Sequence, residues 1–221
     1  MRGLEKFESV LSKKHILTAP EEIATYHTDW SKLAAKGSAV LLPSTTSEVS
    51  ALLKICQTEK ISVVPSGGRT GLVGGATALS DEVILSLTRM NKVGKLDPVV
   101  RTLEVQAGVT TEQVHDLAAK EGLTWPIDLA AKGSSHIGGN LATNAGGVRV
   151  IRYGMTRKWV MGVTAVTMDG SILKLQNGLE KNNCGYDLLQ LLIGSEGTLA
   201  VITEAILKLA QLPKQSNVFL F

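Results

Sequence analysis

Apolar side chains at helical spacing open the chain. They lie at Leu4, Phe7, Val10 and Leu11, and they predict a helix over residues 3–14. A second short helix is predicted to begin at Pro20, because proline suits the first helical position and the acidic Glu21 and Glu22 suit the first turn. The start of the chain is therefore predicted to be helical.

A β-α-β unit follows these helices. Residues 39–42 (AVLL) and 61–64 (ISVV) are short apolar runs that predict buried strands. Between them, Thr45 and Glu48 have the spacing of a capping box, in which each side chain accepts a hydrogen bond from a backbone N–H at the start of a helix. The predicted helix carries an apolar stripe at Val49, Leu52, Leu53 and Cys56.

Beyond this unit, strands outnumber helices. Runs rich in β-branched residues predict strands at 83–87, 102–107, 160–168, 171–175 and 199–209. One helix is predicted near 112–121, with either Thr110 or Thr111 as its N-cap and Gly122 just after its end. Another short helix is predicted over 186–193 (YDLLQLLI).

These elements define a fold class. The pair Asp169-Gly170 is a strong turn signal and is predicted to join its two flanking strands as a hairpin. The pattern predicts an α+β chain of two lobes. A small β-α-β lobe with the N-terminal helices would occupy residues 1–100, and a larger antiparallel-sheet lobe with flanking helices would occupy 101–213.

Composition narrows the class of protein. Hydrophobic residues make up 44% of the 221 residues, and the net charge is only +3 without a long run of Lys or Arg, so a nucleic-acid partner is not expected. Cys56 and Cys184 lie far apart and form no CxxC pair, which favours a reducing compartment. No stretch approaches the roughly 18 apolar residues of a membrane span, and the charged start resembles no signal peptide. We therefore expect a cytoplasmic protein without a transmembrane segment.

A glycine-rich loop directly follows the second predicted strand. Residues 65–75 (PSGGRTGLVGG) hold five glycines, which are costly in chain entropy and are retained where backbone turns sharply or approaches a ligand. Successive N–H groups in such turns form a concave anion site, to which Ser66 and Thr70 add hydroxyls and Arg69 adds charge. The loop predicts a pyrophosphate cradle; a mobile surface loop is the alternative. The chain contains neither GxGxxG nor GxxxxGK[ST], so a Rossmann or P-loop site is excluded.

A second glycine-rich segment runs from 126 to 154. Small and hydrogen-bonding residues predominate over 133–147, which suits backbone packed against a large, planar and polar ligand. An irregular connector beneath the core is the alternative, although connectors of this length are uncommon unless they are functional. A third glycine-containing turn, at 194–198, precedes the last long strand and by itself is only a weak signal.

Together these segments resemble one family. The sequence is similar to the FAD-binding domain of the vanillyl-alcohol-oxidase (PCMH-type) superfamily, in the branch that holds D-2-hydroxyglutarate dehydrogenase, flavin-linked D-lactate dehydrogenases and the glycolate oxidase D subunit. The resemblance covers nearly all of the chain. It rests on LLPSTTSEV (41–49), PSGGRTGLVGGA (65–76), AKGSSHIGGNLATNAGG (131–147), RYG (152–154) and NNCGYDLLQLLIGSEGTLAVIT (182–203).

The resemblance implies a two-lobed PCMH-type fold and a set of FAD-contacting residues. The 66–71 loop would wrap the pyrophosphate with backbone amides, 133–135 would line the adenosine and pyrophosphate path, and 138–147 would pass along the isoalloxazine and ribityl portion. The turn that holds Glu196 would approach the adenine. The implied cofactor-binding residues are Pro43, Pro65, Ser66, Gly67, Gly68, Arg69, Thr70, Gly71, Gly74, Pro126, Asp128, Gly133, Ser134, Ser135, Ile137, Gly138, Gly139, Asn140, Ala142, Thr143, Asn144, Gly146, Gly147, Gly154, Glu196, Gly197 and Ile202.

The histidines bear on how the flavin is held. Some family members attach flavin covalently through a histidine in the first glycine-rich loop, and this loop has none, so we expect non-covalent FAD. His136, in the second segment, is interpreted as helix-entry structure in preference to a polar neighbour of FAD, and not as a base. The other histidines are scattered without metal-ligand spacing, so no metal site is predicted.

The implied chemistry is oxidation of a D-2-hydroxyacid (D-lactate, D-2-hydroxyglutarate or glycolate) to the 2-oxoacid. Electrons would pass from the flavin to a quinone, a cytochrome or an electron-transfer flavoprotein. Family members bind the substrate in a cap domain, and residues 214–221 resemble only the first strand of that domain. We therefore assign no catalytic residue within this chain.

Three alternatives remain open. The chain could serve another flavoenzyme of the same fold, such as a cell-wall precursor reductase or the flavin subunit of a molybdenum hydroxylase. It could be an FAD-binding module that is inactive alone. It could also be a domain whose apolar end, Leu220 and Phe221, is covered by a partner or by a homo-oligomer.

Overall fold

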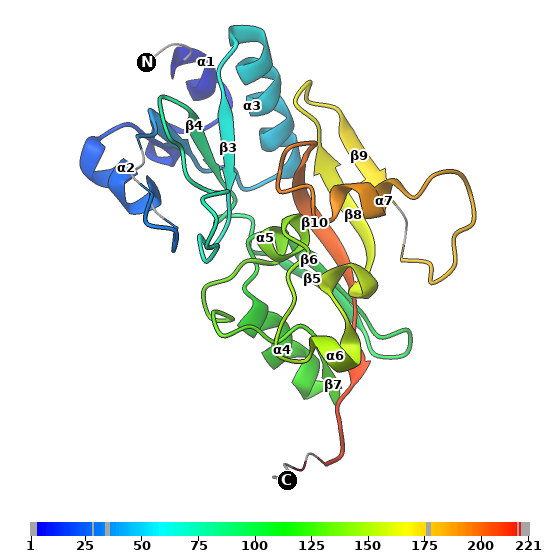
Figure 1. Ribbon diagram of the computed structural model, residues 1–221. Coiled ribbons are helices and arrows are strands. Elements are labelled where there is room, and N and C mark those ends of the chain that lie inside the picture. The colour runs from blue at the N-terminus through cyan, green and yellow to red at the C-terminus, as the bar shows by residue number, and fades with distance from the viewer. Residues whose placement is uncertain (1–3, 28, 34–35, 176–177, 216, 218–221) are drawn as a thin grey trace.

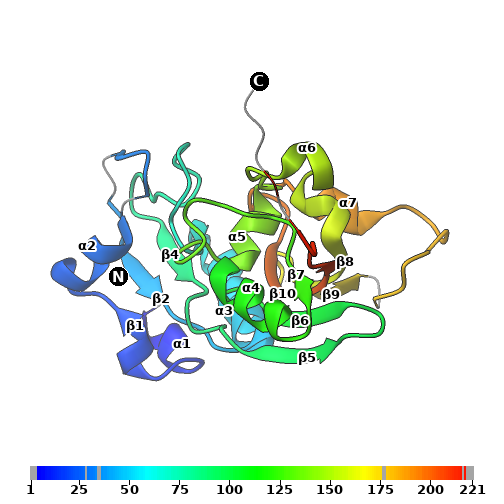
Figure 2. The ribbon, with the colours of Figure 1, turned by 90° about the horizontal axis from the view of Figure 1, so that it is seen from below.

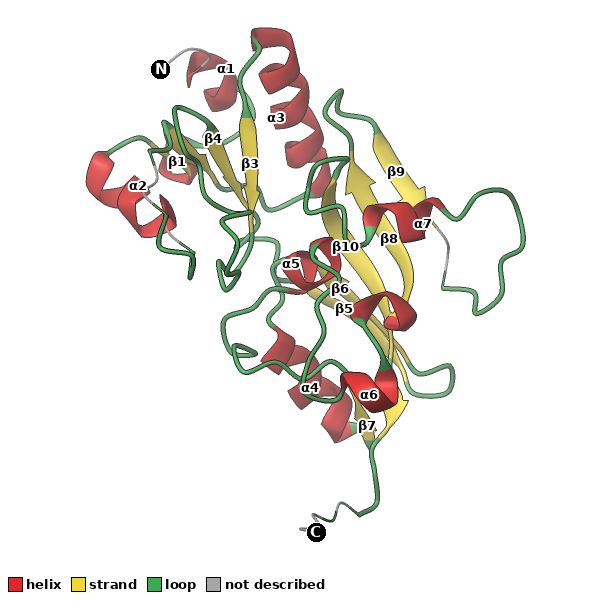
Figure 3. Cartoon of the chain, in the orientation of Figure 1, coloured by secondary structure: helices red, strands yellow, loops and turns green. Residues whose placement is uncertain are grey.

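A computed structural model describes residues 4–27, 29–33, 36–175, 178–215 and 217 of the chain. It has two lobes, each built on its own sheet (Figures 1 and 3). The first sheet has strand order β1-β2-β4-β3, in which β2, β4 and β3 run parallel and β1 is antiparallel to β2. Its strands are β1 (Ile16–Leu17), β2 (Ala39–Leu41), β3 (Val63–Ser66) and β4 (Val83–Ser86).

Helices cover both faces of the first sheet, because its strands alternate side chains between two apolar layers. Leu41 and Leu85 pack with α1 (Leu4–Glu8) and α3 (Thr46–Glu59). Val40 and Ile84, which point the opposite way, pack with Ile23 of α2 (Pro20–His27). Figure 1 shows α1 and α3 on one side of the sheet and α2 on the other. The β2-α3-β3 unit predicted from the sequence is confirmed.

The start of α3 follows the predicted chemistry. Glu48 N–H donates to the Thr45 hydroxyl over 3.1 Å, and Thr45 N–H donates to the Glu48 carboxylate over 3.2 Å, which completes the capping box. Val49 and Leu52 are fully buried along the predicted apolar stripe. The capping box therefore sets where the crossover helix begins after β2.

The second sheet is antiparallel throughout and has the order β5-β6-β10-β8-β9. It begins at Val93, before the expected lobe boundary at residue 100, because β5 pairs with β6. The hairpin predicted around Asp169-Gly170 is present as β8 and β9. The strands are β5 (Val93–Asp97), β6 (Thr102–Gln106), β8 (Val160–Val166), β9 (Ile172–Leu175) and β10 (Val201–Lys208).

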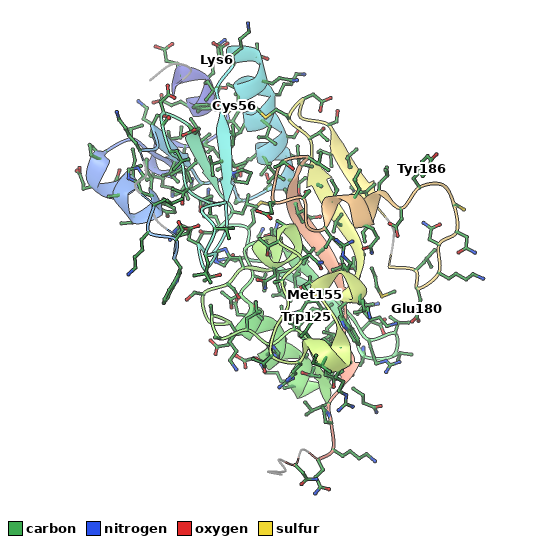
Figure 4. All side chains as sticks on the ribbon, viewed as in Figure 1. Lys6, Cys56, Trp125, Met155, Glu180 and Tyr186 are labelled. Carbon is green, nitrogen blue, oxygen red and sulfur yellow. The ribbon has the colours of Figure 1, made fainter. Side chains whose placement is uncertain are left out.

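Two helices cover the inner face of this sheet. α4 (Thr111–Lys120) and α5 (Ile137–Ala142) pack on it, and Trp125 is completely buried in the same core (Figure 4). Thr110 is the N-cap of α4, and Gly122 follows its end at φ +67°, as predicted. In two perpendicular views α5 lies where the lobes meet (Figures 1 and 2). The α+β fold with a small β-α-β lobe and a larger antiparallel-sheet lobe is confirmed.

Two predicted elements are wrong in extent. The helix over 3–14 ends at Glu8, and a turn leads into the 3₁₀ helix η1 (Lys13–His15). The Ser9 hydroxyl donates to the Lys6 carbonyl over 2.6 Å, and such local bonds compete with a helix. The strand over 61–64 instead covers Val63–Ser66, passing through Pro65. Proline is accommodated there because β3 is an edge strand.

Other boundaries moved by one or two residues, and several short elements lacked a periodic signal. The helix predicted over 186–193 is α7 (Leu188–Leu192), and the strand over 199–209 is β10. The elements not predicted include the short strands β1, β5, β7 (Leu123–Thr124) and β11 (Ala210–Gln211). They also include α5, α6 (Val150–Tyr153) and the 3₁₀ helix η2 (Thr156–Trp159), which lie within the second glycine-rich segment or just after it. The expected cap-domain strand lies mostly outside the described residues.

Candidate functional site

The two lobes enclose a cleft of about 450 Å³. The loop after β3 forms one wall, and α5 with the segments around it forms the other. A volume of this size is typical of a pocket for a small molecule or cofactor. The three glycine-containing segments of the sequence therefore converge on one space.

A second hollow, of about 490 Å³, lies on the outer face of the large sheet. Strand residues line it, with Lys92, Lys174, Glu104 and Glu204 among them. None of the glycine-rich loops contributes to its wall. The cleft between the lobes is therefore the candidate site.

The first glycine-rich loop packs directly on the second. A Cβ atom at Gly68 would lie 1.9 Å from the backbone oxygen of Ser134, so only glycine permits this approach. Arg69, the next residue, has φ +53° in the left-handed region. Its guanidinium lies 4.8 Å from the centre of the Tyr26 ring, a cation–π geometry that holds the charge beside the cleft.

A buried hydrogen-bond network fixes the second segment. Asn140 donates from Nδ2 to the Thr111 hydroxyl over 2.6 Å, and that hydroxyl lies 2.7 Å from the Ser135 hydroxyl. A Cβ at Gly138 would lie 2.6 Å from the Cβ of Ala107, so α5 packs closely on the end of β6. At Gly139, in contrast, a Cβ would meet nothing within 4 Å. The helix is therefore anchored on one side and leaves open space on the other.

This network predicts a measurable effect on stability. Replacing Asn140 by alanine removes a buried donor from Thr111, and we expect the free energy of unfolding to fall by about 1–3 kcal/mol. Urea denaturation of the two proteins measures the difference. The matched control is Thr143→Ala, at the exposed residue just after the end of α5, where a loss below about 0.5 kcal/mol is expected. Equal losses in both variants would contradict a special role for the network.

The turn before β10 joins both walls. Glu196 N–H donates to the Ala142 carbonyl over 2.8 Å, and Gly194 N–H donates to the Leu141 carbonyl over 3.0 Å, which ties the turn to α5. Gly197 has φ +77°, and a Cβ there would lie 3.2 Å from the Pro65 ring. The weakest of the three glycine signals in the sequence is therefore part of the same site.

Arg157 supports the site from behind. Its backbone N–H donates to Asn144 Oδ1 over 3.0 Å, and its guanidinium donates to the carbonyl of Ile193 over 2.8 Å and to the Gln190 side chain over 3.0 Å. These bonds connect the end of the second glycine-rich segment to α7. Asn144 has φ +47°, so the surrounding contacts stabilise a backbone conformation that is uncommon outside glycine.

Three polar atoms at the cleft have unused hydrogen-bonding capacity. Among the described residues, Ser66 Oγ, His136 Nδ1 and Asp29 Oδ2 are buried without a hydrogen-bond partner. Burial, and secondarily the positive charge of Arg69, lower the pKa of His136 below its usual value. Unsatisfied groups of this kind are rare in folded proteins and mark where a ligand can supply the missing partners. With the open space at Gly139, they fit a large polar cofactor.

The structure brings more than half of the predicted cofactor-binding residues to the cleft. Those that line it are Pro65, Ser66, Gly67, Gly68, Arg69, Thr70, Gly71, Gly138, Gly139, Asn140, Ala142, Thr143, Glu196, Gly197 and Ile202. The remaining predicted residues do not line it: Pro43, Gly74, Pro126, Asp128, Gly133, Ser134, Ser135, Ile137, Asn144, Gly146, Gly147 and Gly154.

Several of the residues outside the lining position the wall. Asp128 forms an ion pair with Arg149 over 3.1 Å. A Cβ at Gly147 would lie 2.2 Å from the Asp128 carbonyl oxygen, so this glycine permits two chain segments to touch. Contact of these residues with FAD stays a prediction.

Sequence reasoning missed a further group of lining residues. Trp30 N–H donates to the Gly71 carbonyl over 3.0 Å, which brings the preceding Asp29 to the cleft. Such a contact joins segments far apart in the chain and has no local signal. His136, which was interpreted as structural, also lines the cleft. The other missed residues are Leu72, Val73, Gly75, Ala76, Leu87, Ala107, Leu129, Ala130, Ala131, Ala145, Ala200 and Val201.

The described ranges hold neither a metal-binding cluster nor a membrane-spanning helix. No group of three or more His, Cys, Asp or Glu side chains is placed to hold a metal ion there. In the same residues, no helix is both long and apolar enough to cross a bilayer.

The fold and the cleft define a two-lobed cofactor-binding domain. The sequence profile described as "FAD binding domain" matches residues 37–176, which is more than half of the chain. The chain belongs to this FAD-binding family. The match spans both glycine-rich segments and most of the second sheet, so it covers both walls of the cleft.

Several similar curated proteins are named D-2-hydroxyglutarate dehydrogenase. The chain is 50% identical over 204 residues to the D-2-hydroxyglutarate dehydrogenase of Xanthomonas citri pv. viticola, covering 92% of this chain and 43% of that protein. It is 43% identical to the mitochondrial D-2-hydroxyglutarate dehydrogenase of Arabidopsis thaliana, covering 98% of this chain and 39% of that protein. The chain thus spans less than half the length of the curated relatives it matches.

A solved structure confirms the fold. Alkyldihydroxyacetonephosphate synthase superposes with a TM-score of 0.84 at 23% identity, over 96% of this chain and 40% of that one. At this identity the likeness establishes architecture and carries nothing about the reaction. The PCMH-type fold expected from the sequence is therefore present.

Proposed function

We propose that this chain is the FAD-binding part of a flavin-dependent dehydrogenase that oxidises a D-2-hydroxyacid to a 2-oxoacid, with D-2-hydroxyglutarate as the favoured substrate. The observation that carries the proposal is the cleft between the lobes. Its walls come from the segments that carry the family resemblance. The relatives named D-2-hydroxyglutarate dehydrogenase support this substrate over D-lactate and glycolate.

The residues of the cleft have separate tasks in this proposal. The loop around Gly67 and Gly68 offers backbone N–H groups, and Ser66 and Arg69 add a hydroxyl and a charge, to bind the phosphates. The apolar lining excludes water from the other ligand surfaces; it includes Leu87, Ala107, Ala200 and Val201. Bound FAD would supply the redox chemistry by accepting hydride from the substrate carbon.

The flavin would be held non-covalently. The first glycine-rich loop contains no histidine, and the half-buried His136 is on the opposite wall. A cap domain would supply the groups that bind the substrate carboxylate and deprotonate its hydroxyl. The electron acceptor would be a quinone, a cytochrome or an electron-transfer flavoprotein. One relative is named D-2-hydroxyglutarate–pyruvate transhydrogenase, in Saccharomyces cerevisiae, so acceptors differ among similar proteins.

A second function is an FAD-binding module that is inactive alone. The short coverage of the relatives, 43% in the first of them, favours it for the chain as given. The two functions share the cofactor and differ in turnover. They are therefore separated by one pair of measurements.

The test is a visible absorbance spectrum of the purified chain, with FAD added if the protein is colourless. We expect flavin bands that pass into the supernatant after acid precipitation, because no covalent bond retains the cofactor. Incubation with D-2-hydroxyglutarate and an artificial electron acceptor then distinguishes the functions. Reduction of the acceptor shows that this chain by itself is a working dehydrogenase. Stable flavin without turnover supports the module for the chain as given, and the proposed dehydrogenase is then tested in the same assay with a protein of the relatives' full length. A folded chain that takes up no FAD contradicts both.

A further inference from the structure

Three charged side chains line the cleft. Arg69 lies on the first glycine-rich loop, which packs against the second glycine-rich segment beside His136. The acidic residues come from other segments: Asp29 lies near Gly71, and Glu196 lies near Gly75. Of the three, Arg69 is the one that acts on His136.

His136 lies beside the first glycine-rich loop. A Cβ at Gly67 would lie 3.5 Å from the His136 Cβ and 3.8 Å from Nδ1, so the ring packs on the first loop. The backbone of His136 is fixed, since its carbonyl accepts from Asn140 N–H over 3.0 Å and it forms a bridge with Thr110. The ring has no such restraint, because Nδ1 has no partner among the described residues.

Among the described residues, no carboxylate acts on the ring to compensate for its environment. Of the charged residues on the walls around the ring, Arg69 is the one that acts on His136. Residues 129–131 and 200–202 contribute only apolar side chains to the lining. Burial and then Arg69 lower the His136 pKa, so the ring is neutral near neutral pH. An anion beside the ring would oppose both effects.

We propose that His136 contacts the diphosphate of the cofactor bound at the loop that holds Arg69, and that His136 takes up a proton when this diphosphate binds. The Ser66 hydroxyl, which is buried and without a partner, lies on the same wall as Arg69 and is a third donor to the anion. The inference rests on the proposed function and goes beyond it, because it assigns a role to a side chain that the sequence indicated as structural.

The direction of the pH dependence follows from linkage. The pKa of His136 is low in the free protein and higher in the complex, so the complex binds more protons. FAD affinity therefore rises as the pH falls through the pKa that His136 has in the complex. The affinity levels off once the pH is below the pKa that His136 has in the free protein. Each unit by which the diphosphate raises the pKa gives about tenfold in affinity over this window. The phosphates of FAD are diesterified and do not themselves titrate between about pH 6 and pH 8.

The experiment is a titration of the chain with FAD at several pH values across this range. His136→Gln keeps a polar side chain of similar reach but cannot take up a proton. The matched control is His115→Gln: His115 is also half-buried with a lowered pKa, and it contacts the Ile127 carbonyl at 3.0 Å outside the cleft. We expect several-fold tighter binding at low pH in the unmodified chain and in His115→Gln, and a flat profile in His136→Gln.

A second measurement needs no variant. Calorimetry with FAD in two buffers of different ionisation enthalpy gives the number of protons that the protein takes up on binding. We expect this number to be above zero near pH 7 for FAD, and zero for riboflavin, which lacks the diphosphate. FAD binding without proton uptake, or with a pH dependence that survives in His136→Gln, overturns the inference and leaves the proposed function intact. A folded chain that binds no FAD at any pH overturns both.

Discussion

Replacing Gly68 by alanine is expected to destabilise the chain and weaken FAD binding together. The new Cβ would lie 1.9 Å from the Ser134 carbonyl oxygen, which is backbone and cannot rotate away. The two glycine-rich segments would have to separate, at a cost of about 1–3 kcal/mol in the free energy of unfolding. Because both walls of the cleft move, FAD affinity should fall by about tenfold or more. Thermal denaturation and flavin titration measure the two effects.

The control for this variant lies in the same loop. A Cβ at Gly75 would have Glu196 Oε2 as its nearest neighbour, at an ordinary contact distance of 3.6 Å. Gly75→Ala should therefore change stability by less than about 0.5 kcal/mol. If Gly68→Ala behaved like Gly75→Ala, the close approach of the two segments would not be what shapes the cleft.

Replacing Gly139 by leucine is expected to separate binding from folding. A Cβ at this position would meet no neighbouring atom within 4 Å, and Gly139 lines the cleft, so we expect the leucine side chain to extend into the open space. Removing a glycine from α5 should leave the stability of the free protein unchanged or raise it by up to about 1 kcal/mol. FAD and the leucine side chain would compete for the same space, and affinity should fall by about a hundredfold. Melting curves with and without FAD show both effects.

Alanine is the graded control at this position. Gly139→Ala removes the same backbone freedom but adds a single carbon atom, so it should keep most of the gain in stability and lose less FAD affinity than the leucine variant. A leucine variant that binds FAD normally would show that the cofactor does not pass over α5. Loss of folding in the leucine variant would show that the space at Gly139 is not open.

The shape of the cleft comes from close backbone contacts. Gly68 against Ser134 and Gly138 against Ala107 bring main chains nearer than any side chain allows. The buried bond between Asn140 and Thr111 then fixes the direction of α5. The part of the cleft proposed to bind the phosphates can therefore be rigid before the cofactor arrives, which lowers the entropy lost on binding.

The sequence alone determined the local elements and the class of protein. The capping box of α3, the glycine after α4 and the hairpin at Asp169-Gly170 depend on hydrogen bonds and backbone angles within a few residues, so their signals are complete in short windows. The glycine-rich segments also gave a signal within a short window. They indicated a ligand site because glycine is retained where the backbone needs space.

The tertiary structure alone decided which residues share the cleft. β5 is short and mostly exposed, and it is a strand only because β6 offers it an edge. Asp29 reaches the site through a bond between Trp30 and Gly71, and His136 meets Gly67 across the two lobes. These contacts join residues far apart in the chain. They are stabilised by tertiary packing, which a short window of sequence does not predict. The position of each charge in the cleft, and with it the expected proton uptake, follows from that packing.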